Sequence, residues 1–323
     1  MNHRFIQIMR RATPLAGNHP SSRRAAVVVL SVASLFVLMG AARAPKEVNW
    51  SELNPAFAGA EFVRDASTCA GCHEEALAAY SHTTHARALG ANGRTTTEKL
   101  ECESCHGPRS KHVEDPTNVL ANIAPAGRAQ VCLQCHSASK NHMQWQNSAH
   151  AMANESCDSC HVVMERRSDK ALLKSADETA TCYGCHGEVR GAMQKSSHHP
   201  VREGKMECSS CHNPHGSTGP SLVKFATITE TCTSCHQDKR GPFLWEHPPA
   251  RDNCASCHSA HGSNNRSLLT TKAHMLCLQC HSYGGHINVP RYNRTSTPTQ
   301  QGCVNCHVTP HGSNHPSGAK LTR

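Results

Sequence analysis

The sequence contains ten copies of the pentapeptide Cys-x-x-Cys-His, and these copies use every one of its 20 cysteines. Two thiols at this spacing can be bonded covalently to a porphyrin, and the histidine that follows can then coordinate the iron. Zinc sites and disulfide scaffolds also use closely spaced cysteines, but neither requires a histidine after every pair. We therefore predict ten c-type haems, attached at Cys69, Cys72, Cys102, Cys105, Cys132, Cys135, Cys157, Cys160, Cys182, Cys185, Cys208, Cys211, Cys232, Cys235, Cys254, Cys257, Cys277, Cys280, Cys303 and Cys306.

The histidine that ends each pentapeptide is the predicted proximal ligand of one iron. These ten residues are His73, His106, His136, His161, His186, His212, His236, His258, His281 and His307.

The pentapeptides alternate between two kinds, which reveals an internal repeat. The second kind begins at Cys102, Cys157, Cys208, Cys254 and Cys303, at intervals of 46 to 55 residues, and is mostly followed closely by another candidate ligand. The first kind begins at Cys69, Cys132, Cys182, Cys232 and Cys277. One pentapeptide of each kind makes a module, so residues 69–323 are predicted to form five two-haem modules.

The modules also predict the distal ligands. An upstream histidine precedes each second-kind pentapeptide, namely His85, His150, His199, His247 and His286. A downstream histidine follows in four modules, namely His112, His215, His261 and His311. The tenth position, three residues after His161, holds Met164, whose thioether can also bind haem iron. Packing is the other interpretation of Met164, and His142, His198 or His315 would then supply the missing ligand.

The composition supports a core made of cofactors. Only 37% of the residues are hydrophobic and 4% are aromatic, which is too few for a conventional apolar core in a chain of this length. The predicted fold class is a multihaem cytochrome c, elongated and mostly irregular, with short α-helices such as 74–79 and little or no β-sheet. Ten covalently bound haems would form its core.

The N-terminus predicts export. Arginines precede a mostly apolar run over residues 25–42, so residues 1–44 are interpreted as a signal peptide cleaved near 40–44, with an uncleaved anchor as the alternative. Residues 45–68 form a lead segment before the decahaem domain. Without the first 44 residues the formal charge falls from +9 to +3, and no basic run with interleaved aromatics occurs, which argues against nucleic-acid binding.

Three segments carry a resemblance to a known family: His-Asn-Pro-His-Gly at 212–216, Arg-Gly-Pro-Phe-Leu-Trp-Glu-His at 240–247, and the ending at 311–318. From about Asp65 to its C-terminus the chain resembles the MtrA/DmsE/PioA family of periplasmic decahaem cytochromes. The resemblance implies a thin haem wire inside an outer-membrane β-barrel porin, with bis-histidine ligation. It also implies exchange with an extracellular multihaem cytochrome and with periplasmic or inner-membrane electron-transfer cytochromes. Met164 departs from uniform bis-histidine ligation.

The predicted function is electron transfer through a ten-haem wire, as the periplasmic cytochrome of a porin–cytochrome conduit. Electrons could flow outward to metal oxides or inward from ferrous iron. A soluble periplasmic shuttle is the first alternative. A multihaem reductase is a weaker one, because it needs an iron with an open distal position. We predict no catalytic residues.

Overall fold

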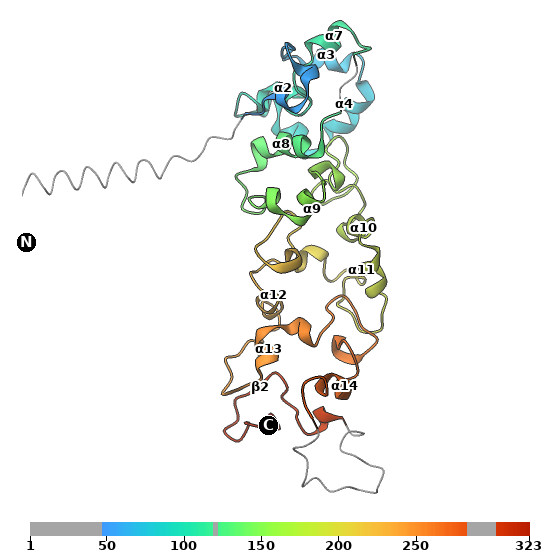
Figure 1. Ribbon diagram of the computed structural model, residues 1–323. Coiled ribbons are helices and arrows are strands. Elements are labelled where there is room, and N and C mark those ends of the chain that lie inside the picture. The colour runs from blue at the N-terminus through green and yellow to red at the C-terminus, as the bar shows by residue number, and fades with distance from the viewer. Residues whose placement is uncertain (1–46, 119–121, 283–301) are drawn as a thin grey trace, which may run out of the picture. The chain divides into compact units, whose positions relative to one another are not determined.

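The computed structural model describes residues 47–118, 122–282 and 302–323, which all belong to one unit that begins at Glu47. Within these ranges, short helices alternate with irregular segments along the whole chain (Figure 1). The predicted signal peptide, residues 1–44, and the predicted ligand His286 lie outside the described residues.

The α-helices of the described residues are short, and the longest of them, α8, has 12 residues. They are α2 (Trp50–Leu53), α3 (Ala66–Ala70), α4 (Glu74–Ser81), α5 (Thr84–Ala88), α6 (Glu103–His106), α7 (Ser110–Glu114), α8 (Pro125–His136), α9 (Ala149–Met152), α10 (Glu178–Tyr183), α11 (Gly187–Ala192), α12 (Ile228–Thr233), α13 (Pro248–Asp252) and α14 (Ala273–Cys277).

Short 3₁₀ helices, one small sheet and four isolated β-bridges complete the secondary structure that the described residues show. The 3₁₀ helices are η1 (Pro55–Phe57), η2 (Gly90–Asn92), η3 (Glu98–Leu100), η4 (Trp145–Asn147), η5 (Cys157–Ser159), η6 (Cys208–Ser210), η7 (Pro220–Leu222), η8 (Gln237–Lys239), η9 (Cys254–Ser256), η10 (Arg266–Leu268) and η13 (Cys303–Asn305). Strands β1 (Trp245–Glu246) and β2 (Gly312–Ser313) pair antiparallel, with Trp245 opposite Ser313. The prediction of short helices with almost no sheet is therefore confirmed.

The two kinds of pentapeptide begin in different local structures. First-kind pentapeptides start within or at the end of α3, α8, α10, α12 and α14. Three of these helices begin at a capping side chain, because Asp65, Asp177 and Thr227 each accept a hydrogen bond from a backbone N–H of the first turn. Second-kind pentapeptides start in the 3₁₀ turns η5, η6, η9 and η13, except that the first of them lies in α6.

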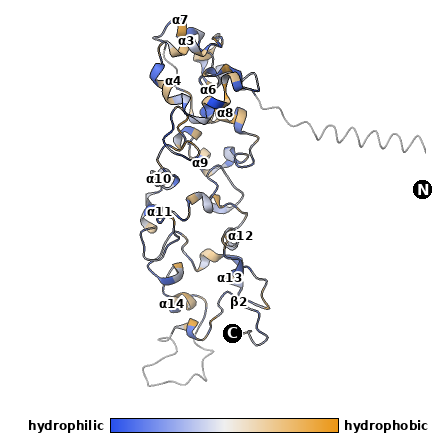
Figure 2. Cartoon of the chain, turned by 180° about the vertical axis from the view of Figure 1, so that it is seen from behind, coloured by the Kyte–Doolittle hydropathy of each residue, from blue (hydrophilic) through white to orange (hydrophobic). Residues whose placement is uncertain are grey.

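Apolar burial in the polypeptide is sparse. The buried apolar side chains of the described residues, among them Phe57, Trp145 and Val223, are scattered along the chain, and the largest side chains that are fully buried there are threonine and serine. Apolar and polar residues are interspersed along the helices (Figure 2). No helix in the described ranges combines the length and apolar character needed to cross a membrane.

Successive modules pack together at the glycines that directly follow three downstream histidines. Gly216, Gly262 and Gly312 have positive φ angles of 120°, 154° and 138°. A Cβ atom on Gly216 would lie 2.5 Å from the Gln144 carbonyl oxygen, and one on Gly262 would lie 2.0 Å from the Ala192 carbonyl oxygen. The glycines at 216 and 262 thus allow two backbones to approach closely, and Gly312 makes room for the Phe243 ring in the same way.

Candidate haem-binding sites

The first cysteines of the two pentapeptides are neighbours within every module. These pairs are Cys69 with Cys102, Cys132 with Cys157, Cys182 with Cys208, Cys232 with Cys254, and Cys277 with Cys303. In the polypeptide alone, burial and then the Cys69 thiol raise the pKa of Cys102 to about 11. Haem attachment converts these sulfurs to thioethers, so what matters for function is their adjacency.

The second cysteines are neighbours across the boundaries between modules. These pairs are Cys105 with Cys135, Cys160 with Cys185, Cys211 with Cys235, and Cys257 with Cys280. Neighbouring thiols within and between modules therefore alternate from Cys69 to Cys303. The ten attachment sites form one series whose order is the order of the sequence.

First-kind proximal histidines face histidines that precede them in the chain, with one exception. Ring centroids lie 6.0 Å apart for His136 and His85, 6.1 Å for His186 and His150, 6.3 Å for His236 and His199, and 6.1 Å for His281 and His247. Each of these partners is the upstream histidine of the preceding module. The exception is His73 at the start of the series, which lies 6.2 Å from the downstream histidine His112 of its own module.

Second-kind proximal histidines face the downstream histidine of the following module. The centroid distances are 6.0 Å for His161 and His215, 5.9 Å for His212 and His261, and 6.0 Å for His258 and His311. Except for His73 and His112, each ring pair joins two modules, so the side chains of one module are placed to complete the coordination of the next or the previous one. We call this arrangement interleaved ligation.

The spacing of the rings fits an iron between them. Two imidazoles that each bind one metal ion through nitrogen at about 2 Å place their ring centroids roughly 6 Å apart. The eight pairs lie between 5.9 and 6.3 Å, although they come from different helices and loops. The residues present therefore fit bis-histidine haem at these eight positions.

Backbone carbonyl groups orient the second-kind proximal rings. The Nδ1 atom of His161 donates to the Ala171 carbonyl at 2.7 Å, and that of His258 donates to the Ser267 carbonyl at 2.8 Å. His212 and His307 make the equivalent bond at 2.9 and 2.7 Å. Because a carbonyl only accepts, Nδ1 must carry the proton, which leaves the Nε2 lone pair for the iron.

Upstream histidines are oriented in the same way, but across the module boundary. The Nδ1 atoms of His150, His199 and His247 donate to the carbonyl groups of Pro214, Ala260 and Pro310 at 2.8 to 2.9 Å. Each acceptor directly precedes a downstream histidine, so one short segment fixes two distal ligands. His85 departs from this arrangement, because its buried Nδ1 has no hydrogen-bond partner in the described structure.

Burial keeps the distal rings in the state that binds metal. Burial, followed by the neighbouring His142, lowers the pKa of His215 to about 4. Burial is also the main reason why the pKa values of His261 and His311 are lowered. Iron binds the neutral imidazole, so these shifts remove the competition between protons and metal at neutral pH.

The eight ring pairs account for eight of the ten proximal histidines and do not include His106 and His307. No described histidine forms such a pair with His106. The predicted distal ligand His286 is the one that remains for His307, and it lies outside the described residues. Met164 is 37% exposed in the polypeptide and follows the pentapeptide that ends at His161.

The histidines considered as alternatives to Met164 have other surroundings. His142 lies 5.8 Å from the His136 ring and 4.5 Å from the His215 ring. The Nε2 atom of His198 lies 3.0 Å from a carboxylate oxygen of Glu203. The Nδ1 atom of His315 accepts a hydrogen bond from the Ser317 N–H at 3.1 Å.

Glu103 has a structural role that the sequence does not predict. It is 3% exposed, and its carboxylate accepts hydrogen bonds from the backbone N–H groups of Val63, Arg64 and Arg109 at 2.8 to 3.0 Å. This carboxylate ties the lead segment to the pentapeptide that begins at Cys102. A glutamate within an attachment motif gives no sequence signal for burial, since most glutamates are solvated.

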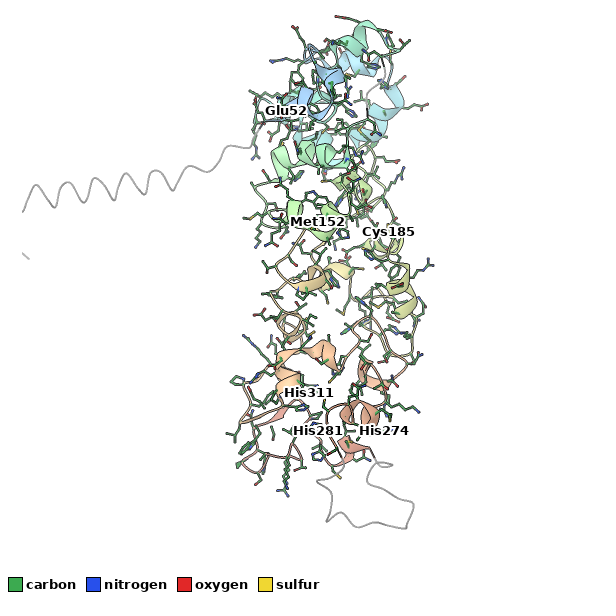
Figure 3. All side chains as sticks on the ribbon, in the orientation of Figure 1. Glu52, Met152, Cys185, His274, His281 and His311 are labelled. Atoms are coloured by element: carbon green, nitrogen blue, oxygen red, sulfur yellow. The ribbon has the colours of Figure 1, made fainter. Side chains whose placement is uncertain are left out.

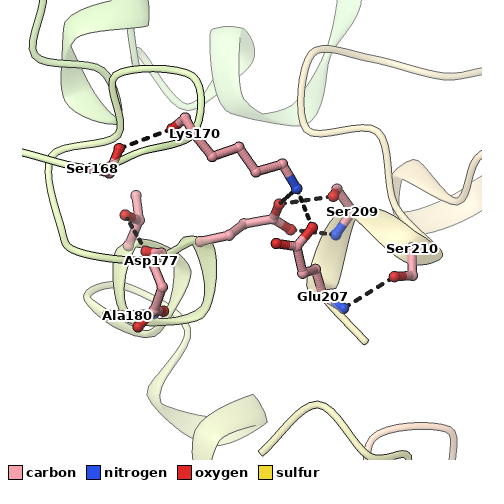
Figure 4. Close-up of polar contacts among 9 residues, drawn as sticks. Ser168, Lys170, Asp177, Ala180, Glu207, Ser209 and Ser210 are labelled. Atoms are coloured by element: carbon pink, nitrogen blue, oxygen red, sulfur yellow. Dashed lines mark hydrogen bonds and ion pairs between the residues drawn. The ribbon is translucent and has the colours of Figure 1, made fainter. Parts of the chain in front are cut away.

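Glu178 performs a related task in the third module, among the polar contacts of Lys170 and Ser209 that Figure 4 shows. It caps no helix, but its carboxylate accepts hydrogen bonds from both the backbone N–H and the hydroxyl group of Ser209. The second-kind pentapeptide at Cys208 is thereby held against α10. Lys170, from the preceding module, lies beside Glu178 and Glu207.

Ten attachment motifs, eight facing imidazole pairs and an alternating series of thiols define a multihaem c-type cytochrome. Residues 150–191, 198–241 and 247–286 match the family described as a doubled CXXCH motif. The chain is also 36% identical over 275 residues to the multiheme cytochrome MtrA of Shewanella baltica (strain OS185), in an alignment that covers 80% of this chain and 82% of the relative. This chain belongs to the MtrA family of multihaem cytochromes, as its motifs predicted, and its cofactors are covalently bound haems.

The family repeat coincides with a unit of ligation. Each of the three matched segments contains both histidines of one facing pair: His150 and His186, His199 and His236, and His247 and His281. Each repeat therefore holds both of the histidines that are predicted to bind one iron. The other proximal histidine of the first two repeats faces the next repeat, and that of the third, His258, faces His311 beyond the matched residues.

Proposed function

We propose that this cytochrome is the periplasmic component of a conduit that carries electrons through an outer-membrane β-barrel porin. The observation that carries the proposal is the unbroken series of attachment sites, in which each pentapeptide neighbours the next from Cys69 to Cys303. A route across a hydrocarbon layer of about 30 Å requires redox sites that succeed one another without a gap. Membership of the MtrA family supports the same role.

The polypeptide fixes the order of the haem sites and closes both axial positions of the iron. Bound haem supplies reversible one-electron chemistry, and the chain keeps the sites in sequence and places imidazoles on both sides. In the eight facing pairs the ring spacing leaves room for the iron and for no further ligand. A site with two protein ligands has no position for a substrate, which favours electron transfer over catalysis.

The proposal includes export and partners. Residues 1–44 would act as a signal peptide, and the assembled protein would exchange electrons with an extracellular multihaem cytochrome and with periplasmic or inner-membrane cytochromes. Either direction of flow is compatible with this arrangement. A soluble periplasmic shuttle is the competing role, because it needs the same haem series but no barrel.

Fractionation of cells that produce the protein tests the conduit. Haem-stained protein should remain with the outer membrane after a high-salt wash and should copurify with a β-barrel protein identified by mass spectrometry. A soluble c-type cytochrome of the same cells serves as the control and should leave with the periplasmic contents. Release of the decahaem protein as a monomer together with that control would overturn the conduit and favour the shuttle.

A reductase remains a second candidate because of one observation. Among the described residues, no imidazole forms a facing pair with the proximal histidine His106. Addition of cyanide or nitrite to the purified holoprotein distinguishes the two roles. An electron carrier should show no change in its absorption spectrum, whereas binding at one haem would favour an enzyme.

A further inference from the structure

We propose that Met164 is the distal ligand of the iron whose proximal ligand is His106, so that one haem near the start of the series has histidine–methionine ligation. The sequence marks Met164 as a candidate ligand but does not say which iron it serves. The pattern of interleaved ligation identifies that iron. The inference concerns coordination alone and does not depend on the porin.

A single rule describes the second-kind sites. The partner of each proximal histidine is the third or fourth residue after the next second-kind pentapeptide, at a centroid distance of 5.9 to 6.0 Å. The pairs are His161 with His215, His212 with His261, and His258 with His311. The rule thus holds at every later boundary between modules.

The same rule at the first boundary selects one residue. The second-kind pentapeptide that follows His106 ends at His161, and the third residue after it is Met164. A methionine thioether is one of the side chains that bind haem iron in c-type cytochromes. Position 164 therefore keeps a ligand, and only its chemistry changes from imidazole to thioether.

No competing histidine has a described contact with His106. His142 lies against the rings of His136 and His215, which belong to two later sites. His198 faces Glu203, and His315 uses its Nδ1 to accept from Ser317.

The first boundary departs from the later ones in two further respects. Glu165 follows Met164, whereas the downstream histidines at the later boundaries are followed by the glycines Gly216, Gly262 and Gly312. The three later upstream histidines donate Nδ1 to a carbonyl, but the buried Nδ1 of His85 has no partner in the described structure. The change of ligand thus accompanies a local change in how the modules meet.

Thioether ligation changes the energetics of that site. Methionine in place of histidine raises the reduction potential of a haem. The site at His106 would accept an electron more readily than its bis-histidine neighbours, so an electron would dwell near the first module.

Spectroscopy of the oxidised holoprotein tests the assignment. The band that arises from charge transfer between a thioether and ferric haem should be present, with the intensity of one haem in ten. Met164→Ala should abolish it. Met164→His should also abolish it, while all ten haems stay low-spin in electron paramagnetic resonance. Met152→Ala is the matched control, because Met152 lies exposed on α9 of the same module (Figure 3), and this variant should keep the band.

Removal of single haems identifies the iron. The double variant Cys102→Ala/Cys105→Ala should lose the band together with one haem, whereas Cys69→Ala/Cys72→Ala should lose a haem and keep the band. A band that survives the first double variant would overturn the assignment to His106. A wild-type protein without the band, or with one haem that binds cyanide, would overturn Met164 ligation altogether.

Discussion

The substitution Gly262→Ala tests the packing between modules that creates the interleaved sites. Alanine at this position would have to adopt a φ of 154°, and its Cβ would lie 2.0 Å from the Ala192 carbonyl oxygen, the last residue of α11. The backbone conformation alone costs about 1–3 kcal/mol for a residue other than glycine. Displacement of the neighbouring carbonyl adds to this cost, so Gly262→Ala should lower the free energy of unfolding by about 3 kcal/mol.

The expected loss in unfolding free energy is large enough to be measured as a shift in Tm. A loss of about 3 kcal/mol should lower the Tm by roughly 6–12 °C for a chain of this size. Thermal unfolding followed by circular dichroism measures it directly. Gly191→Ala is the matched control, because Gly191 lies in α11 with open space around its missing Cβ, and helix propensity should there raise stability by up to about 1 kcal/mol.

Two results would refute this reasoning. Equal unfolding temperatures for Gly262→Ala and the wild type would show that the modules do not meet through this close contact. A fall in Tm that the Gly191→Ala control shares would place the effect in α11 itself. Since His261 directly precedes the glycine, we also expect Gly262→Ala to disturb the low-spin signal of the haem held by His212.

Further predictions concern the ligands and the buried carboxylates. His215→Ala should turn one haem of ten high-spin, and that signal should disappear when the attachment cysteines before His161 are also removed, in spectra of the oxidised protein. Glu103→Ala should expose residues 47–64 to limited proteolysis, because three part-buried backbone N–H groups lose their carboxylate acceptor at about 1 kcal/mol each; unchanged cleavage would contradict this. Glu178→Ala should lower the Tm, whereas Lys170→Met should leave it nearly unchanged, since the lysine is 56% exposed and exposed ion pairs contribute little. Equal losses for the last two variants would show that the ion pair, and not the bond to Ser209, holds the pentapeptide.

The sequence predicts the covalent chemistry well because that chemistry is local. Two cysteines and a histidine within five residues are sufficient to specify a haem, and the scarcity of apolar residues predicts the fold class. The pairing of ligands is different. His161 and His215 lie in different modules, and tertiary contacts such as those of Gly216 with Gln144 and of His150 with Pro214 bring their rings together, so spacing alone could not reveal which rings share an iron.

Buried carboxylates could not be predicted for a related reason. Glu103 owes its role to backbone N–H groups from two other segments, and nothing in its immediate neighbours distinguishes it from a solvated glutamate. The ligand role of Met164 stays a prediction, because the described structure fixes the surrounding pattern and not the bond itself.

Interleaved ligation imposes an order on biosynthesis. Haem can be joined to the His161 pentapeptide as soon as that segment is available, but the facing ring of His215 comes from the next module. Every second-kind iron whose pair is described therefore lacks its second protein ligand until roughly fifty more residues of the chain have been exported and folded. A chain that stopped between modules would leave its last second-kind iron with one protein ligand, so the number of modules can change only together with the facing histidine that the next module provides.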